Sequence, residues 1–161
     1  MDIKFSLYED DASYTPVKAH EEDACYDLFA RSYATPEDLE TEKEAIYLAP
    51  GQRCLVRTGV FLQMEPGWEA LVRPRSGNAL KQGITILNTP GTIDAGYRNE
   101  IGVILHNAGQ RMLELAKGMK IAQIAFRPIP QHKMVLVSRA DFDADTARSL
   151  NGFGSTGTCG K

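Results

Sequence analysis

The amino-acid sequence predicts an all-β fold, arranged as a sandwich or a barrel. Short apolar or alternating runs recur at a spacing of roughly 8 to 12 residues, which is typical of such folds. Glycine, proline, asparagine and aspartate separate the runs, and 161 residues are enough for one domain with a buried core. We therefore expect strands at Ile3–Leu7, Ala45–Leu48, Cys54–Leu62, Glu69–Val72, Ile84–Leu87, Ile101–Leu105, Arg111–Leu115, Ile121–Phe126 and Met134–Val137.

Two short segments interrupt the β pattern. Thr35–Asp38 contains a cap residue, a proline at the first helical position and early acids, which favours a helical turn. This turn begins an acidic insertion, residues 35–44, to which the sequence assigns no role. Ser76–Lys81 is expected to form the one short helix of the fold, opened by a serine cap.

The strand pattern stops near Asp141, so we expect a single core domain over residues 1–140 and an extended arm over residues 141–161. Within the arm, residues 148–157 combine glycines and hydroxyl side chains with one arginine and one phenylalanine, a composition that builds neither strand nor helix. Such a segment can wrap phosphates with its N–H groups and its arginine, and can stack its ring on a base. A flexible tail has the same composition.

Charge and composition limit the classes of function. The formal net charge of −3 argues against a general nucleic-acid binder, because backbone affinity comes from clustered lysine and arginine. No apolar run approaches the length of a membrane span, and the N-terminal residues form no signal peptide. We expect a soluble, intracellular protein located in the cytoplasm, with no nucleic-acid or membrane partner.

Neither the cysteines nor the histidines indicate a metal site. The cysteines are odd in number and lack C-x-x-C spacing, which favours ordinary reduced thiols at Cys25, Cys54 and Cys159. The histidines stand at no ligand spacing, which favours structural roles for His20, His106 and His132.

Two loop segments carry residues suited to nucleotide chemistry. Arg73–Gly77 joins a guanidinium and a hydroxyl to a helix start, which together make a small anion site, although an isolated copy of this pattern is more often a surface turn. Leu87–Glu100 connects two apolar strands and can present backbone groups to a base edge. Within it, Asp94 precedes Tyr97 by three residues, so a carboxylate and an aromatic face can share one mouth. A turn aspartate and a half-buried tyrosine are the alternative.

Two strand-like segments carry polar residues among apolar ones. Ala24–Ala30 contains Asp27, which must point outward, pair with a partner or serve a site. Gly118–Phe126 contains Gln123, which is either part of a site or a satisfied structural amide.

Taken in order, these segments resemble the five sequence motifs of the trimeric dUTPases, the deoxyuridine triphosphate nucleotidohydrolases. The matching segments, from motif one to motif five, are Ala24–Ala30, Pro74–Gly77, Asn88–Glu100, Gly118–Phe126 and Arg148–Gly157. The resemblance implies a jelly-roll-like β-clip fold with a C-terminal arm, and a homotrimer whose sites are shared between subunits. It also implies Mg²⁺-dependent hydrolysis of dUTP to dUMP and diphosphate, which keeps uracil out of DNA and supplies dUMP for dTMP synthesis.

The same resemblance implies a role for each matching residue of the hairpin segment. Asp94 is expected to orient and deprotonate the attacking water. Tyr97 is expected to pack on the deoxyribose and leave no space for a 2′-hydroxyl. The uracil edge is expected to meet Asn88 and the backbone of Gly91 and Ile93.

Phosphate and metal contacts are implied for the remaining motifs. Phosphate binding is implied for Arg75, Ser76, Gly77 and Gln123. Asp27 is expected to contact the waters of a Mg²⁺ ion that the triphosphate chelates. On the arm, Phe153 is expected to stack on uracil, and closure over the phosphates is implied for Arg148, Gly154, Ser155 and Thr156.

Seven positions depart from the family pattern, and the effect of these departures is open: Cys25, Asn78, Asn99, Met119, Lys120, Ser149 and Asn151. Motif two usually continues with leucine where Asn78 stands, and motif four often has arginine where Lys120 stands. Two alternative functions stay open as well. One is a nucleotide-sensing protein that binds dUTP without turnover, and the other is a dCTP deaminase of the same fold.

Overall fold

The computed structural model describes residues 2–143 and 145–146 of the chain. The chain divides into two compact units, residues 1–130 and residues 131–161. The predicted site residues Arg148, Phe153, Gly154, Ser155 and Thr156 lie outside the described residues.

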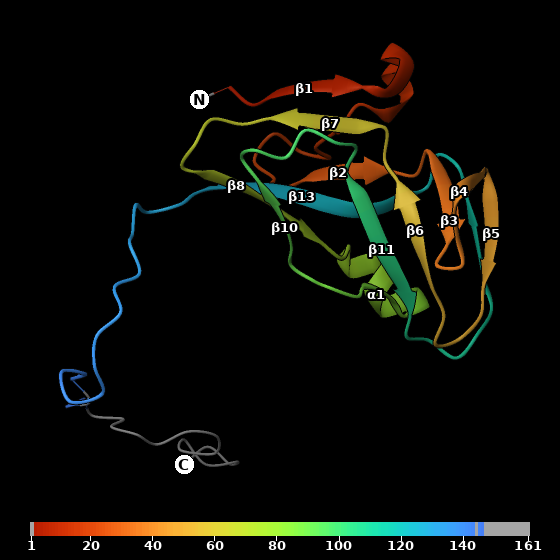
Figure 1. Cartoon of the computed structure of the whole chain (residues 1–161). Helices are drawn as coiled ribbons and strands as arrows, with labels where there is room; N and C mark the ends of the chain where they lie inside the picture. Colours follow the sequence, from red (N-terminus) through yellow and green to blue (C-terminus); the bar gives the residue numbers. More distant parts are fainter. Residues whose placement is uncertain (1, 144, 147–161) are drawn as a thin grey trace. The chain divides into compact units, whose positions relative to one another are not determined.

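The first unit is built almost entirely from antiparallel strands, which confirms the predicted all-β class (Figure 1). One sheet has the strand order β10-β8-β13-β2, formed by Gly91–Asp94, Trp68–Arg73, Lys120–Pro128 and Tyr26–Phe29. The second has the order β4-β3-β6-β11-β9, formed by Asp38–Lys43, Ser32–Thr35, Arg53–Arg57, Gly102–Asn107 and Ile84–Ile86. Two two-stranded ladders complete the unit: β1 (Lys4–Leu7) with β7 (Val60–Gln63), and β12 (Leu113–Ala116) with β5 (Ala45–Leu48).

One hydrophobic core joins the sheets. Side chains alternate along β11, where Val103 and Leu105 are buried and Gly102 and Ile104 are exposed, as expected for a strand with one face on the core. The second cysteine of the chain, Cys54, is buried in this core, and burial raises the pKa of its thiol to about 12. A thiol with so high a pKa is a packing group and not a nucleophile.

The expected strand Cys54–Leu62 is in fact two strands, β6 and β7. The chain turns between them at Gly59, whose φ of +73° lies in the left-handed region. A Cβ atom at this position would stand 2.8 Å from Cδ2 of Tyr14, so the turn needs glycine for its dihedral angle and for its space. In the sequence, Arg57, Thr58 and Gly59 mark this break between two apolar segments.

The predicted helical turn at Thr35–Asp38 is wrong. Strands β3 and β4 form a hairpin there, in which Thr35 pairs with Asp38. A four-residue ion cluster holds the hairpin to the core. Buried Arg31 donates to Glu42 at 2.6 and 2.8 Å and to Glu100 at 3.0 and 3.1 Å, and Nε of Arg57 lies 3.2 Å from the Glu42 carboxylate. Hydrogen bonds from Arg31 are the largest cause of the lowered pKa of Glu42. Tertiary charge pairing thus overrides the local helix signal.

Residues Met134–Val137, which we expected to form a strand, have no regular secondary structure, and all four are exposed. Strand β13 ends at Pro128, and Pro130 follows shortly after it. Apolar composition alone does not make a strand, because a strand also needs a neighbour to accept its hydrogen bonds. Among the described residues, no strand pairs with this segment.

The single α-helix of the described residues, α1, spans Ser76–Gln82 and confirms the predicted helix. Its N-cap position is Arg75 and not a serine, and no side chain caps it. At its other end, Gly83 has a φ of +70° and closes the helix in the left-handed conformation. The amide of Ala108 donates to the carbonyl of Gly83 at 2.9 Å, so the C-terminal end of α1 is attached to the loop that follows β11.

Candidate active site

A polar pocket of about 350 Å³ brings together residues from three of the predicted motifs. The pairing of β13 with both β2 and β8 explains this, because Gln123 lies opposite Asp27 on one side and opposite Arg73 on the other. The chain then leaves β8 and enters α1 directly beside them. Five of the predicted site residues line the pocket: Asp27, Arg75, Ser76, Gly77 and Gln123.

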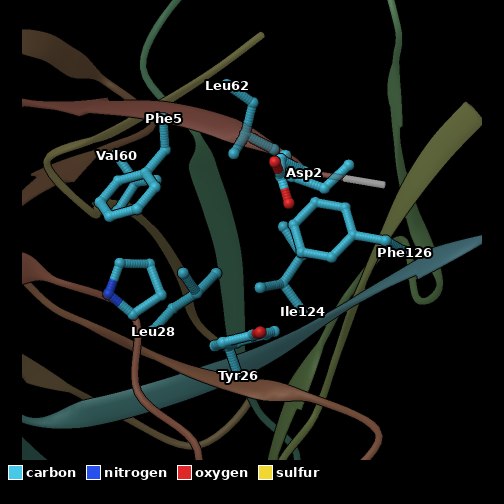
Figure 2. Close-up of a pocket in the computed structure, with 10 residues that line it drawn as sticks. Asp2, Phe5, Tyr26, Leu28, Val60, Leu62, Ile124 and Phe126 are labelled. Carbon is cyan, nitrogen blue, oxygen red and sulfur yellow. The ribbon is translucent and has the colours of Figure 1, made fainter. Parts of the chain in front are cut away.

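Strands β2 and β13 carry polar side chains on one face and apolar side chains on the other. Asp27 and Gln123 face the polar pocket, whereas their neighbours in the chain, Tyr26 and Ile124, line a second pocket of about 310 Å³ (Figure 2). Figure 2 shows a mainly apolar lining there, with Asp2 among the apolar side chains, and the rings of Phe126 and Tyr26 meet edge to face with their centroids 6.3 Å apart. The period of two along each strand therefore separates a charged site from an apolar one.

Asp27 is the electrostatic centre of the polar pocket. Its carboxylate accepts from Nε of Arg75 at 2.8 Å and forms an ion pair with Nζ of Lys120 at 3.0 Å. Burial by itself would raise the pKa of Asp27, but hydrogen bonds from Lys120 and Arg75 outweigh it and lower that pKa. Asp27 is thus ionised at neutral pH, and its carboxylate holds the cationic side chains of Arg75 and Lys120 beside the pocket.

Side-chain amides complete the hydrogen bonding where β8 ends. Gln123 donates from Nε2 to the carbonyl of Pro74 at 2.8 Å, and Asn78 donates from Nδ2 to the carbonyl of Lys120 at 3.0 Å. These bonds fix the segment that contains Arg75 and Ser76 against β13. Gln123 is therefore a satisfied amide that also lines the pocket, which combines the two alternatives that the sequence offered.

The predicted residues of motif three lie on and beside β10. Asp94 ends this strand and is exposed, and the amide of Tyr97 donates to the carbonyl of Asp94 at 3.0 Å. The hydroxyl of Tyr97 donates to the carbonyl of Glu100 at 2.9 Å, so its ring is held over the turn. Asp94 and Tyr97 thus share one turn, which fits both a shared mouth and the alternative of a turn aspartate beside a half-buried tyrosine.

Of the base-contacting residues predicted for this motif, Asn88 and Gly91 lie at the other end of β10, whereas Ile93 directly precedes Asp94. Asn88 is exposed in the loop before the strand, whereas Gly91 is buried at its first position and Ile93 is half-buried. A Cβ atom on Gly91 would stand 3.4 Å from Nδ2 of Asn88. The absence of a side chain at Gly91 therefore leaves room for the Asn88 amide beside the backbone.

Within one chain, Asp94 and the phosphate-binding segment lie at opposite ends of β8. Asp94 pairs with Glu69 near the beginning of β8, and α1 follows the end of the same strand at Arg73 (Figure 1). Glu69 and Arg73 are four residue steps apart along the strand, or about 13 Å at the usual rise per residue. The pocket accordingly gathers motifs one, two and four but does not include Asp94 or Tyr97.

The sequence did not single out every residue that lines or supports the pocket. Cys25 and Lys120 were recognised only as departures from a family pattern, yet Cys25 lines the pocket and Lys120 is paired with Asp27. Asp23, Ala19 and Ala24 line it as well. The signal that could have found them is their position next to motif one, since residues preceding a site strand form the mouth of the pocket.

No preassembled metal centre is present among residues 2–143 and 145–146, where no group of three or more histidine, cysteine, aspartate or glutamate side chains could hold an ion. In the same residues, no helix is long and apolar enough to cross a membrane. A cation that reached the polar pocket would therefore meet the Asp27 carboxylate and would need further ligands from a bound molecule.

Comparison with known proteins identifies the family. The dUTPase family model matches residues 11–157. A deoxyuridine 5′-triphosphate nucleotidohydrolase of Clostridium tetani is 44% identical over 155 residues, which cover 96% of each chain. One of Gloeothece citriformis is 46% identical over 146 residues, covering 91% of this chain and 90% of that protein.

Solved structures agree on the fold. The dUTPase of Staphylococcus bacteriophage 80alpha, with dUpNHpp bound, superimposes with a TM-score of 0.77 at 24% identity and covers 98% of this chain and 99% of its own. A mutant dUTPase from phage phi11 of S. aureus, which coordinates a structural Mg(II) ion, gives a TM-score of 0.70 at 21% identity, covering 88% of this chain and 100% of its own. These neighbours have the jelly-roll-like β architecture that the sequence implied. The chain belongs to the dUTPase family and is a nucleotide hydrolase.

Proposed function

We propose that the protein hydrolyses dUTP to dUMP and diphosphate. The observation that supports this most directly is the polar pocket, where Arg75, Ser76 and Gln123 gather beside the carboxylate of Asp27. Guanidinium, hydroxyl and amide donors at a helix start suit the phosphates of a nucleotide. In the cell this reaction would keep uracil out of DNA and supply dUMP for dTMP synthesis, and we place the enzyme in the cytoplasm.

Asp94 is the proposed general base. A water oxygen attacks the α-phosphorus in line with the bridging oxygen of the β-phosphate, and the bond from phosphorus to that bridging oxygen breaks. The water loses its proton to the carboxylate of Asp94, and diphosphate leaves with the bonding electron pair. The exposure of Asp94 at the end of β10 suits this role, because the carboxylate must reach a water and not a protein donor.

Selection of the base and the sugar falls to the hairpin around β10. The amide of Asn88 and the backbone of Gly91 and Ile93 would read the edge of uracil, so that a 5-methyl group clashes and the reversed polarity of cytosine is rejected. The ring of Tyr97, held by its hydrogen bond to Glu100, would cover the deoxyribose and exclude a 2′-hydroxyl.

Closure over the nucleotide is assigned to the C-terminal arm, residues 141–161. Phe153 would stack on the base, and the proposed phosphate contacts are Arg148, Gly154, Ser155 and Thr156. Enclosure removes bulk water and strengthens the charge interactions around the phosphates.

A Mg²⁺ ion carried by the triphosphate fits the donor set of the pocket. Mg²⁺ keeps several waters and is usually held by one or two carboxylates together with substrate phosphates. Asp27 would contact it through water, and the ion would neutralise phosphate charge during the reaction. When the nucleotide enters, Arg75 can move its donors from Asp27 to a phosphate.

We further propose a homotrimer in which each site combines residues from more than one subunit. A general base must lie within about 3 Å of the proton that it removes. Asp94 and the phosphate-binding segment lie at opposite ends of β8 in one chain, and this separation supports a site that combines the hairpin of one subunit with the pocket of another.

Incubation with dUTP and Mg²⁺, followed by assay of diphosphate and dUMP, tests the proposal. Release of both products in equal amounts is expected, and a folded protein that releases neither contradicts it. Tight binding of dUTP with negligible hydrolysis would instead indicate a nucleotide sensor, and release of ammonia from dCTP would indicate a deaminase. Sedimentation of the protein at a trimer mass tests the shared site.

A further inference from the structure

A backbone carbonyl is left without a strand partner where β8 ends. Strand β13 pairs with β8 only from Gln123 onward, so the β8 side of Lys120 faces no strand. The carbonyl before it, that of Met119, accepts from Ala30 on the β2 side at 2.8 Å. Because consecutive carbonyls of an extended chain point in opposite directions, the carbonyl of Lys120 points away from β2 and toward α1.

Two side chains from the beginning of α1 supply the missing donors. Asn78 donates to the carbonyl of Lys120 at 3.0 Å, and Nη1 of Arg75 donates to the same oxygen at 3.4 Å. Arg75 also binds Asp27, through Nε at 2.8 Å and through Nη2 at 3.4 Å. The two longer bonds of Arg75 are therefore both made by its terminal nitrogens, which are the atoms best placed to move to a phosphate.

We propose that Asn78 is a positioning residue that frees Arg75 to bind phosphate. The inference rests on the proposed dUTP hydrolysis and adds one residue to it. While Asn78 satisfies the Lys120 carbonyl, Nη1 of Arg75 can leave that oxygen for a phosphate oxygen without leaving a half-buried acceptor unpaired. Without the Asn78 amide, the same movement removes the last described donor from the carbonyl.

Asn78 also fixes the start of the helix. A seven-residue helix without a side-chain cap is too short to be stable by itself. Its C-terminal end is attached through Gly83 and Ala108, and the Asn78 amide attaches the N-terminal end to β13. A leucine at this position could not donate a hydrogen bond to the Lys120 carbonyl.

The test replaces Asn78 by leucine and measures hydrolysis and binding separately. Asn78→Leu should raise the KM for dUTP about tenfold while kcat stays within about twofold, because an unpaired acceptor weakens phosphate binding and not the chemical step. Affinity for dUpNHpp, measured by calorimetry, should fall to the same extent, whereas affinity for deoxyuridine, which lacks phosphate, should not change. Asn78→Gln, which keeps the amide, should recover part of the loss.

Two further variants separate this role from a general effect on folding. In the background of Arg75→Ala, adding Asn78→Leu should cause no further loss of dUpNHpp affinity, because Asn78 acts through Arg75. Gln82→Ala, at the exposed end of the same helix, should leave the KM unchanged. Independent effects in the double variant, or an equal loss of deoxyuridine affinity, would overturn the proposal. Unmodified protein that hydrolyses dUTP in the same assay would leave the proposed function intact in either case.

Discussion

Asp94 lies directly opposite Glu69 across the ladder of β10 and β8. This register places the proposed general base near the beginning of β8, whereas Arg75 follows the end of that strand. The proposed general base and the proposed phosphate-binding residue thus lie beside opposite ends of β8. A shift of register would change which face of β10 carries Asp94, because side chains alternate along a strand.

Removing the carboxylate of Asp94 should abolish turnover without abolishing binding. Asp94→Asn keeps the size of the side chain but cannot accept a proton from water, so kcat should fall by about 10²- to 10⁴-fold. The affinity for dUpNHpp should stay within about threefold, since the amide still fits the site. The matched control is Glu69→Gln, the same chemical change at the cross-strand neighbour, which should leave kcat unchanged. A loss of binding with unchanged turnover per bound nucleotide would assign Asp94 to recognition instead.

Deleting residues 148–161 should leave a folded protein that hydrolyses dUTP poorly. The core elements from β1 to β13 all lie before residue 130, so the melting temperature should change by no more than a few degrees. Diphosphate release should drop at least a hundredfold because the proposed phosphate contacts of the arm are lost. Deleting only residues 158–161, beyond motif five, is the control and should preserve activity. Full activity in the longer deletion would show that the arm does not close the site.

Gly83 and Gly51 allow backbone strain to be separated from crowding. Both have positive φ, but a Cβ atom at Gly83 would stand 2.6 Å from Cα of Gly109, whereas nothing lies within 4 Å of one at Gly51. Gly51→Ala should lower the free energy of unfolding by about 1 kcal/mol, from the left-handed conformation alone. Gly83→Ala should lower it by about 2 to 4 kcal/mol, since the clash adds to that cost. Urea unfolding of both variants measures the difference, and equal losses would contradict the close approach.

The ion cluster around Arg31 predicts a pH-dependent contribution from Glu42. Hydrogen bonds from Arg31 lower the pKa of Glu42 in the folded protein, so its contribution to stability is present above the unfolded pKa and is lost as pH falls through the folded pKa. Glu42→Gln should therefore lower the free energy of unfolding by about 1 to 2 kcal/mol at pH 7, a value reduced for partial solvent exposure.

The pH dependence of this difference is the sharper measurement. As pH falls through the lowered pKa of Glu42, its carboxylate becomes protonated in the folded protein, and the stability of the unmodified protein should approach that of Glu42→Gln. Glu40→Gln, an exposed glutamate on the same strand, is the matched control and should show little effect at either pH. A difference in unfolding free energy that stays constant across the whole acid range would show that the charge of Glu42 does not contribute to stability.

Local sequence patterns located most strands and the helix of this protein. Apolar alternation was sufficient for β11 and β5, and the Ser76 segment was sufficient for α1, because these signals depend on neighbours in the chain. The family motifs added Asp27, Arg75 and Gln123 as one group, and these three do line one pocket of the folded chain. The motif residues of the arm, from Arg148 to Thr156, are known only from the sequence.

Tertiary contacts decided the remainder. The helix signal at Thr35 lost to a hairpin because Arg31, a residue of the core, pairs with Glu42. Lys120 and Asn78 interact because β13 begins at Lys120 but pairs with β8 only from Gln123, which leaves the Lys120 carbonyl to be satisfied by α1. The sequence by itself determined which residue types carry the chemistry, since short motifs encode local backbone and charge. The separation of Asp94 from Arg75 depends on long-range strand register, which only the folded sheet determines.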